Sequence, residues 1–310
     1  MRSYYIKRIL SAIFTLFIIA TLTFFMMKLM PGGPFARERP IDPIILERLE
    51  EKYNLNDPII VQYFKYMLGV VQFDFGVSYK ELGVNVTDTI LQKFPISLKL
   101  GLYATIAVII IGIPIGIVSA LKQNTWIDQA AMFIATIGVT IPSFVVAVVY
   151  ISFVAGTLGW VDAFGLDKWS SYIGPVIALA AYALSFVSRL TRSSMLEVLR
   201  QDYIRTARAN GLPKYKVLYK HALKNALIPV VTYLGPMFAA IITGSFVVER
   251  VFAIGGIGKY YVESVSNRDY TMIMGVTIFY AVIYIFMVLL VDIAYSWIDP
   301  RIKFGKSSGE

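Results

Sequence analysis

Six stretches of the chain contain no Asp, Glu, Lys or Arg, and they are 19 to 33 residues long. A helix needs roughly 20 consecutive apolar residues to cross the hydrocarbon core of a bilayer. We therefore predict an all-α, polytopic membrane protein with six transmembrane helices. The stretches are Ile9–Met27, Leu100–Leu121, Gln129–Val161, Trp169–Ser188, Asn225–Val248 and Tyr270–Val291.

Two of these stretches need separate interpretation. Gln129–Val161 is too long for one simple span, so we place a helix at Ala130–Gly156, kinked at Pro142, followed by an interfacial segment that carries Trp160. A re-entrant segment is the alternative there. The first stretch follows basic residues as a signal peptide would, but its apolar part is too long and lacks a small-residue cleavage site, which favours a retained helix.

The composition supports the membrane interpretation. Charged residues make up 16% of the chain, whereas soluble domains have about 25%. This shortage excludes an ordinary soluble enzyme, and the high apolar content excludes disorder, collagen and coiled coil. The chain has no Cys, which excludes disulfides and thiolate metal sites.

The net charge of +9 is distributed unevenly over the predicted loops. Basic residues in short loops stay on the cytoplasmic side of a membrane. If the chain starts inside, the four cytoplasmic segments hold 16 Lys and Arg and the two short external loops hold 4. We therefore expect both termini in the cytoplasm of a multi-pass inner-membrane protein, and the excess charge gives no reason to expect nucleic acid.

The predicted organisation has four parts. Residues 1–30 form the cytoplasmic N-terminus and first helix, and 31–99 form a small external subdomain with helical patterns at Ile44–Tyr53 and Ile59–Leu68. Residues 100–298 hold helices two to six with a cytoplasmic loop at 189–226, and 299–310 are a cytoplasmic tail. In the second membrane helix, Gly112 and Gly116 form a small-xxx-small pattern that permits close contact with another helix.

Catalytic signatures are absent from the sequence. Gly255–Tyr260 resembles a phosphate-binding loop, but it lacks the first glycine and the Ser or Thr after Lys259. His221 is the only histidine, so a site with two histidine ligands is excluded, and we interpret it as a helix-surface residue. No GxSxG elbow is present. The sequence therefore favours transport over catalysis.

The predicted loop at 189–226 contains residues that are typical of helix ends and helix starts, which indicates a structured element. Ser193–Asn210 is rich in helix formers, Gly211 suits a helix C-terminal cap, and Pro213 suits the first turn of a second helix through Lys214–Ala226. The second helix has an apolar side and a basic side. The apolar side contains Val217, Leu218, Ala222 and Leu223, and the basic side contains Lys214, Lys216, Lys220 and Lys224. A solvated positive loop is the alternative, but it needs no such architecture.

The segment Asp202–Leu212 resembles the cytoplasmic loop of ABC-importer permeases of the dipeptide/oligopeptide class, and the resemblance continues through His221–Val231. In the wider importer family this loop carries Glu-Ala-Ala and, after three residues, Gly. Arg205, Thr206 and Ala207 occupy the first three positions here and Gly211 the fourth, so only the alanine and the glycine match outright.

Further matches to this class occur in order along almost the whole chain. Phe25–Lys28 and Ala120–Thr125 are most similar to the first membrane subunit of oligopeptide permeases. The other matching segments are Met30–Phe35, Asn54–Pro58, Asp74–Ser78, Thr191–Met195, Gly244–Glu249, Asn267–Tyr270 and Asp299–Ile302.

The resemblance implies a type I ABC-importer permease fold and a subunit that forms half of a translocation pathway for peptides, with oligopeptides favoured over dipeptides. The implied partners are a homologous second permease, two cytoplasmic ATPases that bind ATP and Mg²⁺, an extracytoplasmic solute-binding protein, and the lipid bilayer. This chain would hold no cofactor. The implied ATPase-coupling residues are Asp202, Tyr203, Arg205, Thr206, Ala207, Arg208, Ala209, Gly211 and Leu212.

Three other functions stay open from the sequence. A permease of the same class could carry nickel, glutathione or sugar oligomers instead of peptides. A secondary carrier or channel could also have six helices, but it would need no structured coupling loop. An intramembrane enzyme is the third, and the missing catalytic signatures count against it.

Overall fold

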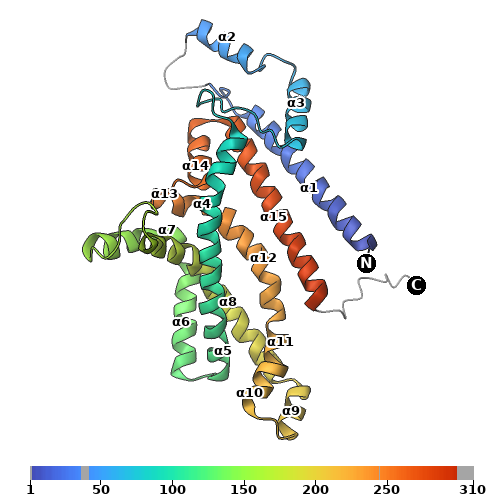
Figure 1. Ribbon diagram of the computed structural model, residues 1–310, viewed down its shortest axis with the longest axis vertical. Helices are drawn as coiled ribbons and strands as arrows, with labels where there is room; N and C mark the ends of the chain where they lie inside the picture. The colour runs from blue at the N-terminus through green and yellow to red at the C-terminus, as the bar shows by residue number, and fades with distance from the viewer. Residues whose placement is uncertain (1, 36–41, 244, 299–310) are drawn as a thin grey trace. The chain divides into compact units, whose positions relative to one another are not determined.

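The structure is a computed structural model that describes residues 2–35, 42–243 and 245–298, and in these ranges the chain is helical (Figure 1). The predicted tail at 299–310 lies outside the described residues. One isolated antiparallel bridge, Val77 to Asn85, is the β feature of the described part. The α-helices are α1 (Arg2–Leu29), α2 (Pro43–Lys52), α3 (Ile59–Val71), α4 (Val86–Ala107), α5 (Ile113–Leu121), α6 (Trp126–Thr140), α7 (Ser143–Tyr150), α8 (Ile173–Leu199), α9 (Asp202–Ala209), α10 (Lys214–Lys216), α11 (Leu223–Ala226), α12 (Ile228–Thr243), α13 (Phe246–Val251), α14 (Ile257–Asn267) and α15 (Tyr270–Ile298).

Shorter helical segments continue or precede these helices. Three are π-helical: η1 (Val108–Gly112) between α4 and α5, η2 (Ile151–Thr157) after α7, and η4 (Val217–Ala222) between α10 and α11. The 3₁₀ turn η3 (Trp169–Tyr172) leads into α8. A π segment holds one extra residue per turn and often occurs at functional positions of helices.

The predicted membrane helices are present, with one in two pieces. Among the described residues, five helical stretches are long and apolar enough to cross a membrane, and a bent pair makes a sixth if it counts as one span. The five are Ile6–Leu29, Val86–Leu121, Trp169–Leu199, Ile228–Val251 and Tyr270–Val291, and the pair is Trp126–Thr140 with Ser143–Thr157. The prediction of an all-α polytopic protein is confirmed.

The predicted kink at Pro142 is a break of 102° between α6 and α7 (Figure 1). Proline disfavours the α conformation of the residue before it. Ile141 accordingly has extended backbone angles, φ −83° and ψ 123°, and Pro142 becomes the N-cap of α7. The helix predicted over Ala130–Gly156 is therefore broken at Pro142 rather than kinked there, and the bent pair keeps both a single broken span and a re-entrant segment open.

The segment between the first two predicted membrane helices holds the expected short helices, α2 and α3. It also contains the start of α4, because this helix begins at Val86 rather than near Leu100 and continues through Pro95. The predicted stretch Leu100–Leu121 therefore covers only the later part of a longer helical segment. Its start was missed because Lys93 and Lys99 are charged, so the charge-free run begins only at Leu100.

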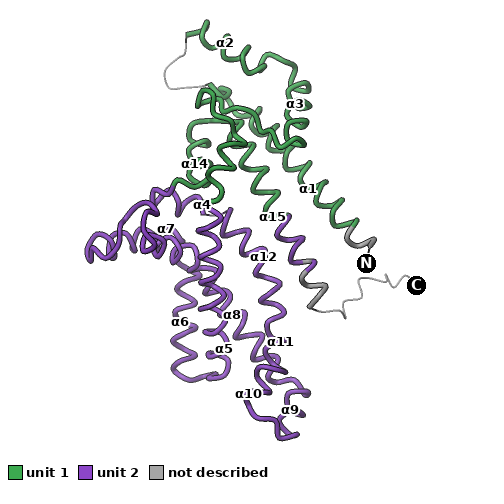
Figure 2. Tube along the Cα trace, viewed as in Figure 1, with its two compact units in different colours: residues 1–96, 255–285 green, residues 97–254, 286–310 purple. Residues whose placement is uncertain are grey.

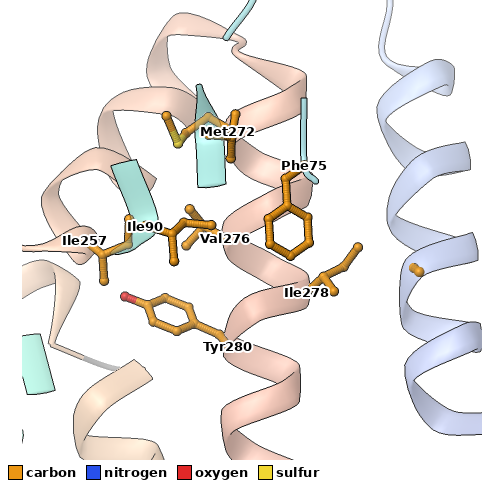
Figure 3. Close-up of a cluster of buried hydrophobic side chains, with 9 residues drawn as sticks. Phe75, Ile90, Ile257, Met272, Val276, Ile278 and Tyr280 are labelled. Atoms are coloured by element: carbon orange, nitrogen blue, oxygen red, sulfur yellow. The ribbon is translucent and has the colours of Figure 1, made fainter. Parts of the chain in front are cut away.

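The chain divides into two compact units (Figure 2). Unit 1 contains residues 1–96 and 255–285, so residues 31–96 belong to the same unit as α1, α14 and the first part of α15. A buried apolar cluster forms its core (Figure 3). Gly275 is required there, because a Cβ at this position would lie 2.6 Å from Val86 Cγ1. The labelled members of the cluster are Phe75, Ile90, Ile257, Met272, Val276, Ile278 and Tyr280.

Unit 2 contains residues 97–254 and 286–310, and α5 packs closely along α8 within it. A Cβ added at Gly116 would lie 2.5 Å from the carbonyl oxygen of Ser188, and one at Gly112 would lie 3.2 Å from that of Leu184. The Ser188 hydroxyl donates a hydrogen bond of 3.1 Å to the Gly112 carbonyl. The predicted close contact at this glycine pair is confirmed.

Candidate coupling helix and its support

The candidate site is α9, which follows α8 after a two-residue break. One helix was predicted over Ser193–Asn210, and this is wrong because α8 ends at Leu199 and Gln201 has extended angles, φ −68° and ψ 149°. The break lets Ile204 and Ala207 fold back into a buried cluster with Met195 at the end of α8. Burial of these apolar side chains therefore outweighs the helix propensity of the segment.

The C-terminal end of α9 confirms the predicted glycine cap. Gly211 has φ +75°, in the left-handed region that glycine adopts without strain. The Leu212 amide donates to the Ala207 carbonyl at 3.3 Å and the Gly211 amide donates to the Arg208 carbonyl at 3.0 Å. These two bonds form a Schellman motif. Pro213 then precedes the next helix as its N-cap, one position earlier than predicted.

The second helix has the predicted two sides but a different backbone. α10, η4 and α11 follow one another over Lys214–Ala226, and the middle part is π-helical. Val217, Ala222 and Ala226 are buried in the same cluster as Ile204, and Leu218 and Leu223 pack at its edge. The four lysines of the basic side are exposed. The buried side therefore holds α9 in place.

The structure divides the predicted coupling residues into a supporting position and an exposed face. Ala207 is buried at 6% exposure and packs inward. The Tyr203 hydroxyl accepts a hydrogen bond of 2.8 Å from Asn225 Nδ2, and Arg205 lies 3.5 Å from the Asp202 carboxylate. The exposed positions are Asp202, Tyr203, Arg205, Thr206, Arg208, Ala209, Gly211 and Leu212.

Sequence reasoning missed Ile204, which is fully buried and anchors α9. The signal was available, because Ile204 and Ala207 are three residues apart and so share one helix face. With these two residues packed inward, the opposite face of α9 is free to present its charged and polar side chains.

A cavity of about 650 Å³ lies beside α9 in unit 2. Leu121, Leu199 and Leu218 supply apolar walls, and Arg208 and Lys214 supply positive charge. Such a combination suits an apolar side chain of a partner protein that is flanked by acidic residues. The remaining lining residues are Leu212, Tyr215 and Val217.

A buried ion pair, also missed, supports the same end of unit 2. Arg192 Nε and Nη2 donate to the two Asp128 carboxylate oxygens at 2.6 and 2.7 Å. The Asn124 amide donates to Asp128 Oδ2 at 2.9 Å, and the Ser119 hydroxyl donates to Oδ1. The Asp128 side chain is only 4% exposed. The pair joins α6 to α8 seven residues before α8 ends.

In unit 1, three of the family-like segments meet around Asp269, the residue before α15. Its carboxylate accepts hydrogen bonds from the Ser78 hydroxyl, the Tyr79 amide at 3.1 Å and the Thr271 hydroxyl at 3.0 Å. The neighbouring Arg268, at φ +57°, donates from Nη1 to the Pro31 carbonyl at 2.8 Å. The spacing along the sequence gave no indication that these segments are in contact.

The sequence and the fold both match known transport proteins. Residues 112–304 match the family described as "Binding-protein-dependent transport system inner membrane component", and residues 1–101 match its N-terminal companion family. The chain is 47% identical to the dipeptide transport system permease protein DppB of Bacillus subtilis, over 99% of both chains. It is 44% identical to the oligopeptide transport system permease protein OppB of Salmonella typhimurium, over 98% of this chain and all of that one.

Among solved structures, an inward-facing form of the MetNI methionine ABC transporter is similar in fold. Its TM-score is 0.56 at 18% sequence identity, and the match covers 68% of this chain and 96% of that chain. At this identity the likeness concerns the fold alone. It supports the predicted permease architecture.

Proposed function

Because the chain belongs to the family of binding-protein-dependent transport system inner membrane components, we propose that it imports peptides through a pathway shared with a second permease. It is a permease subunit of an ABC importer and a multi-pass inner membrane protein. The observation that carries the peptide assignment is the identity of 47% over 99% of both chains with a dipeptide permease. The match to an oligopeptide permease at 44% supports the same substrate class.

The exposed face of α9 is the proposed contact with the cytoplasmic ATPases. A conformational change requires contacts that differ between two states, and a rigid element is needed to pass the displacement on. The buried Ile204 and Ala207 and the capped end at Gly211 give α9 this rigidity. ATP binding by the partner subunits would then move the two permease halves as rigid bodies in alternating access.

The proposed partners each supply a function that this chain lacks. A homologous second permease completes the pathway, two ATPase subunits bind ATP and Mg²⁺, and an extracytoplasmic solute-binding protein delivers the peptide. This chain supplies the conduit and the coupling segment without an ATPase site of its own.

Peptide uptake by the complete complex tests the proposed function. We expect proteoliposomes with both permeases, both ATPases and the binding protein to accumulate a radiolabelled tetrapeptide only when ATP is supplied. Uptake should fall to background when the ATPase subunits are left out. Accumulation of nickel, glutathione or a sugar oligomer in place of peptide would overturn the substrate class, and ATP-independent uptake would favour a carrier or channel.

We propose that both termini lie in the cytoplasm and that residues 31–99 contribute an external subdomain. The chain has no cysteine, so single cysteines can be introduced without background. We expect Asp57→Cys to react with a membrane-impermeant maleimide in cells with a permeabilised outer membrane, whereas Lys122→Cys should react only after lysis. The opposite pattern would reverse the topology.

A further inference from the structure

Unit 1 contains a cavity of about 330 Å³ that the proposed transport function does not use. Its walls come from the last turns of α1, from the end of α2 and the turn that follows it, from α3, from the turn at 74–79 and from the first two turns of α15. Ligand sites in proteins have volumes of about 300–1,000 Å³, so this cavity is large enough for a small polar group.

The cavity wall carries more positive than negative charge. Lys28, Lys52 and Lys65 line it, and Asp74 is the one carboxylate among the lining residues. Lys65 is paired with Asp57 at 2.7 Å. Lys28 donates to the uncharged Gln62 Oε1, and Lys52 Nζ lies 5.6 Å from the centre of the Tyr53 ring. Lys28 and Lys52 therefore have no carboxylate partner among the described residues.

Two buried hydroxyl groups belong to residues of the same wall. The hydroxyls of Tyr66 and Tyr270 are shielded from solvent, and within the described part of the chain they have no hydrogen-bond partner. Tyr270 is only 3% exposed. A buried polar group without a partner is costly, and a bound acceptor would recover this cost when the tyrosine rings turn their hydroxyls into the cavity.

The tyrosines of the wall are donors at neutral pH. Burial raises the pKa of the Tyr66 phenol, and burial together with the charge of Asp269 raises the pKa of Tyr79 to about 12. The Asp269 carboxylate does not line the cavity, and its oxygens already accept from Ser78, Tyr79 and Thr271. The wall therefore suits an anion with several acceptor oxygens.

The position of the cavity relative to α1 indicates the source of such an anion. Lys28 lies in the last turn of α1, at the end of the span Ile6–Leu29. Large apolar side chains are exposed along this helix, including Phe14, Leu22 and Met26. A lipid whose acyl chains lie along α1 would bring its headgroup to Lys28, because a long basic side chain near a helix end extends to the membrane interface.

We propose that this cavity binds the phosphate headgroup of an anionic phospholipid. Lys28 and Lys52 supply the charge, the Tyr66 and Tyr270 rings turn so that their hydroxyls donate to phosphate oxygens, and α1 carries the acyl chains. A bound lipid would join α1 to the turn at 74–79 and to the first part of α15, all of which belong to unit 1.

Native mass spectrometry of the assembled transporter with phosphatidylglycerol and phosphatidylcholine tests this proposal. We expect retention of phosphatidylglycerol over phosphatidylcholine. Lys28→Gln and Lys52→Gln should each weaken that retention by about fivefold. The matched control Lys93→Gln, a lysine outside the cavity wall, should leave it unchanged.

A second pair of variants removes only a hydroxyl group. Tyr270→Phe should weaken phosphatidylglycerol retention, whereas Tyr280→Phe, a buried tyrosine outside the cavity wall, should not. Thermal unfolding of the assembled complex separates binding defects from misfolding, because the proposal requires unchanged unfolding in Lys52→Gln, whose side chain is exposed.

Three results would overturn the proposal. The first is equal retention of the two lipids by the unaltered protein. The second is displacement of phosphatidylglycerol by soluble glycerol phosphate at equal concentration, which would make the ligand a free phosphate. The third is one-for-one displacement by a tetrapeptide, which would make the cavity part of the peptide pathway.

Discussion

Replacing Asp128 with alanine is expected to destabilise the protein by about 3 kcal/mol. The change leaves the guanidinium of Arg192, whose side chain is 24% exposed, without its bidentate partner. Removing one member of a buried pair is costly because the other charge remains buried, whereas replacing both members by apolar groups is often neutral. The free energy of unfolding in detergent micelles, measured by denaturant titration, gives the size of the effect.

The chain offers a matched control for this prediction. Asp162 pairs with Lys168 at 3.0 Å, but its side chain is 49% exposed. Exposed pairs contribute about 0–1 kcal/mol, so Asp162→Ala should have little effect. The double variant Asp128→Leu/Arg192→Met should recover most of the loss. Equal destabilisation by Asp128→Ala and Asp162→Ala would show that the buried pair contributes no more to the free energy of unfolding than the exposed pair does.

Replacing Gly211 with valine is expected to uncouple ATP hydrolysis from peptide uptake. At φ +75° a β-branched residue is strongly disfavoured, and a non-glycine residue costs about 1–2 kcal/mol in this region. Apart from Gly211 itself and its two chain neighbours, no atom lies within 4 Å of the position of a new Cβ, so the penalty arises from the local backbone alone. The Schellman end of α9 would change shape, and uptake per ATP hydrolysed should fall by about tenfold in the assembled complex.

Graded substitutions separate this effect from general strain. Asparagine tolerates the left-handed region, so Gly211→Asn should couple almost normally and Gly211→Ala should be intermediate. Gly159 has φ +63° and equally open surroundings, and Gly159→Val should lower stability without uncoupling. Normal ATP-driven uptake by an assembled Gly211→Val complex would refute the role of this cap.

The features predicted correctly are those with a local physical cause. Apolar stretches of sufficient length marked the membrane helices, and the helix–Gly–Pro punctuation marked the end of α9 at Gly211. The glycine pair at Gly112 and Gly116 indicated the contact with α8 because only glycine allows such close approach. Each of these signals is complete within one continuous segment of the sequence.

The features that were missed depend on tertiary contacts. Asp128 and Arg192 are 64 residues apart, and neither has a local pattern that identifies its partner. The break at Gln201 has no Gly or Pro, and it arises because Ile204 packs back on Met195. The π segment η4 keeps the same buried side chains as an α-helix would, so the hydrophobic pattern could not reveal it.

The distinction between dipeptide and oligopeptide permeases also exceeds what the sequence pattern determines. The chain is 47% identical to one and 44% identical to the other, each over nearly its whole length. The segments that meet at Asp269 position the fold. They do not report the size of the peptide.

The hydrogen bond between Ser78 and Asp269 has a consequence for biosynthesis, because it joins residues 191 positions apart. Ribosomes add about 5–20 residues per second, so the Ser78 hydroxyl waits on the order of 10–40 s for its acceptor. Until then residues 1–96 lack the α14 and α15 segments that complete unit 1. We therefore expect the chain to depend most on insertion factors, and to be most susceptible to proteolysis, while only its N-terminal third has been synthesised.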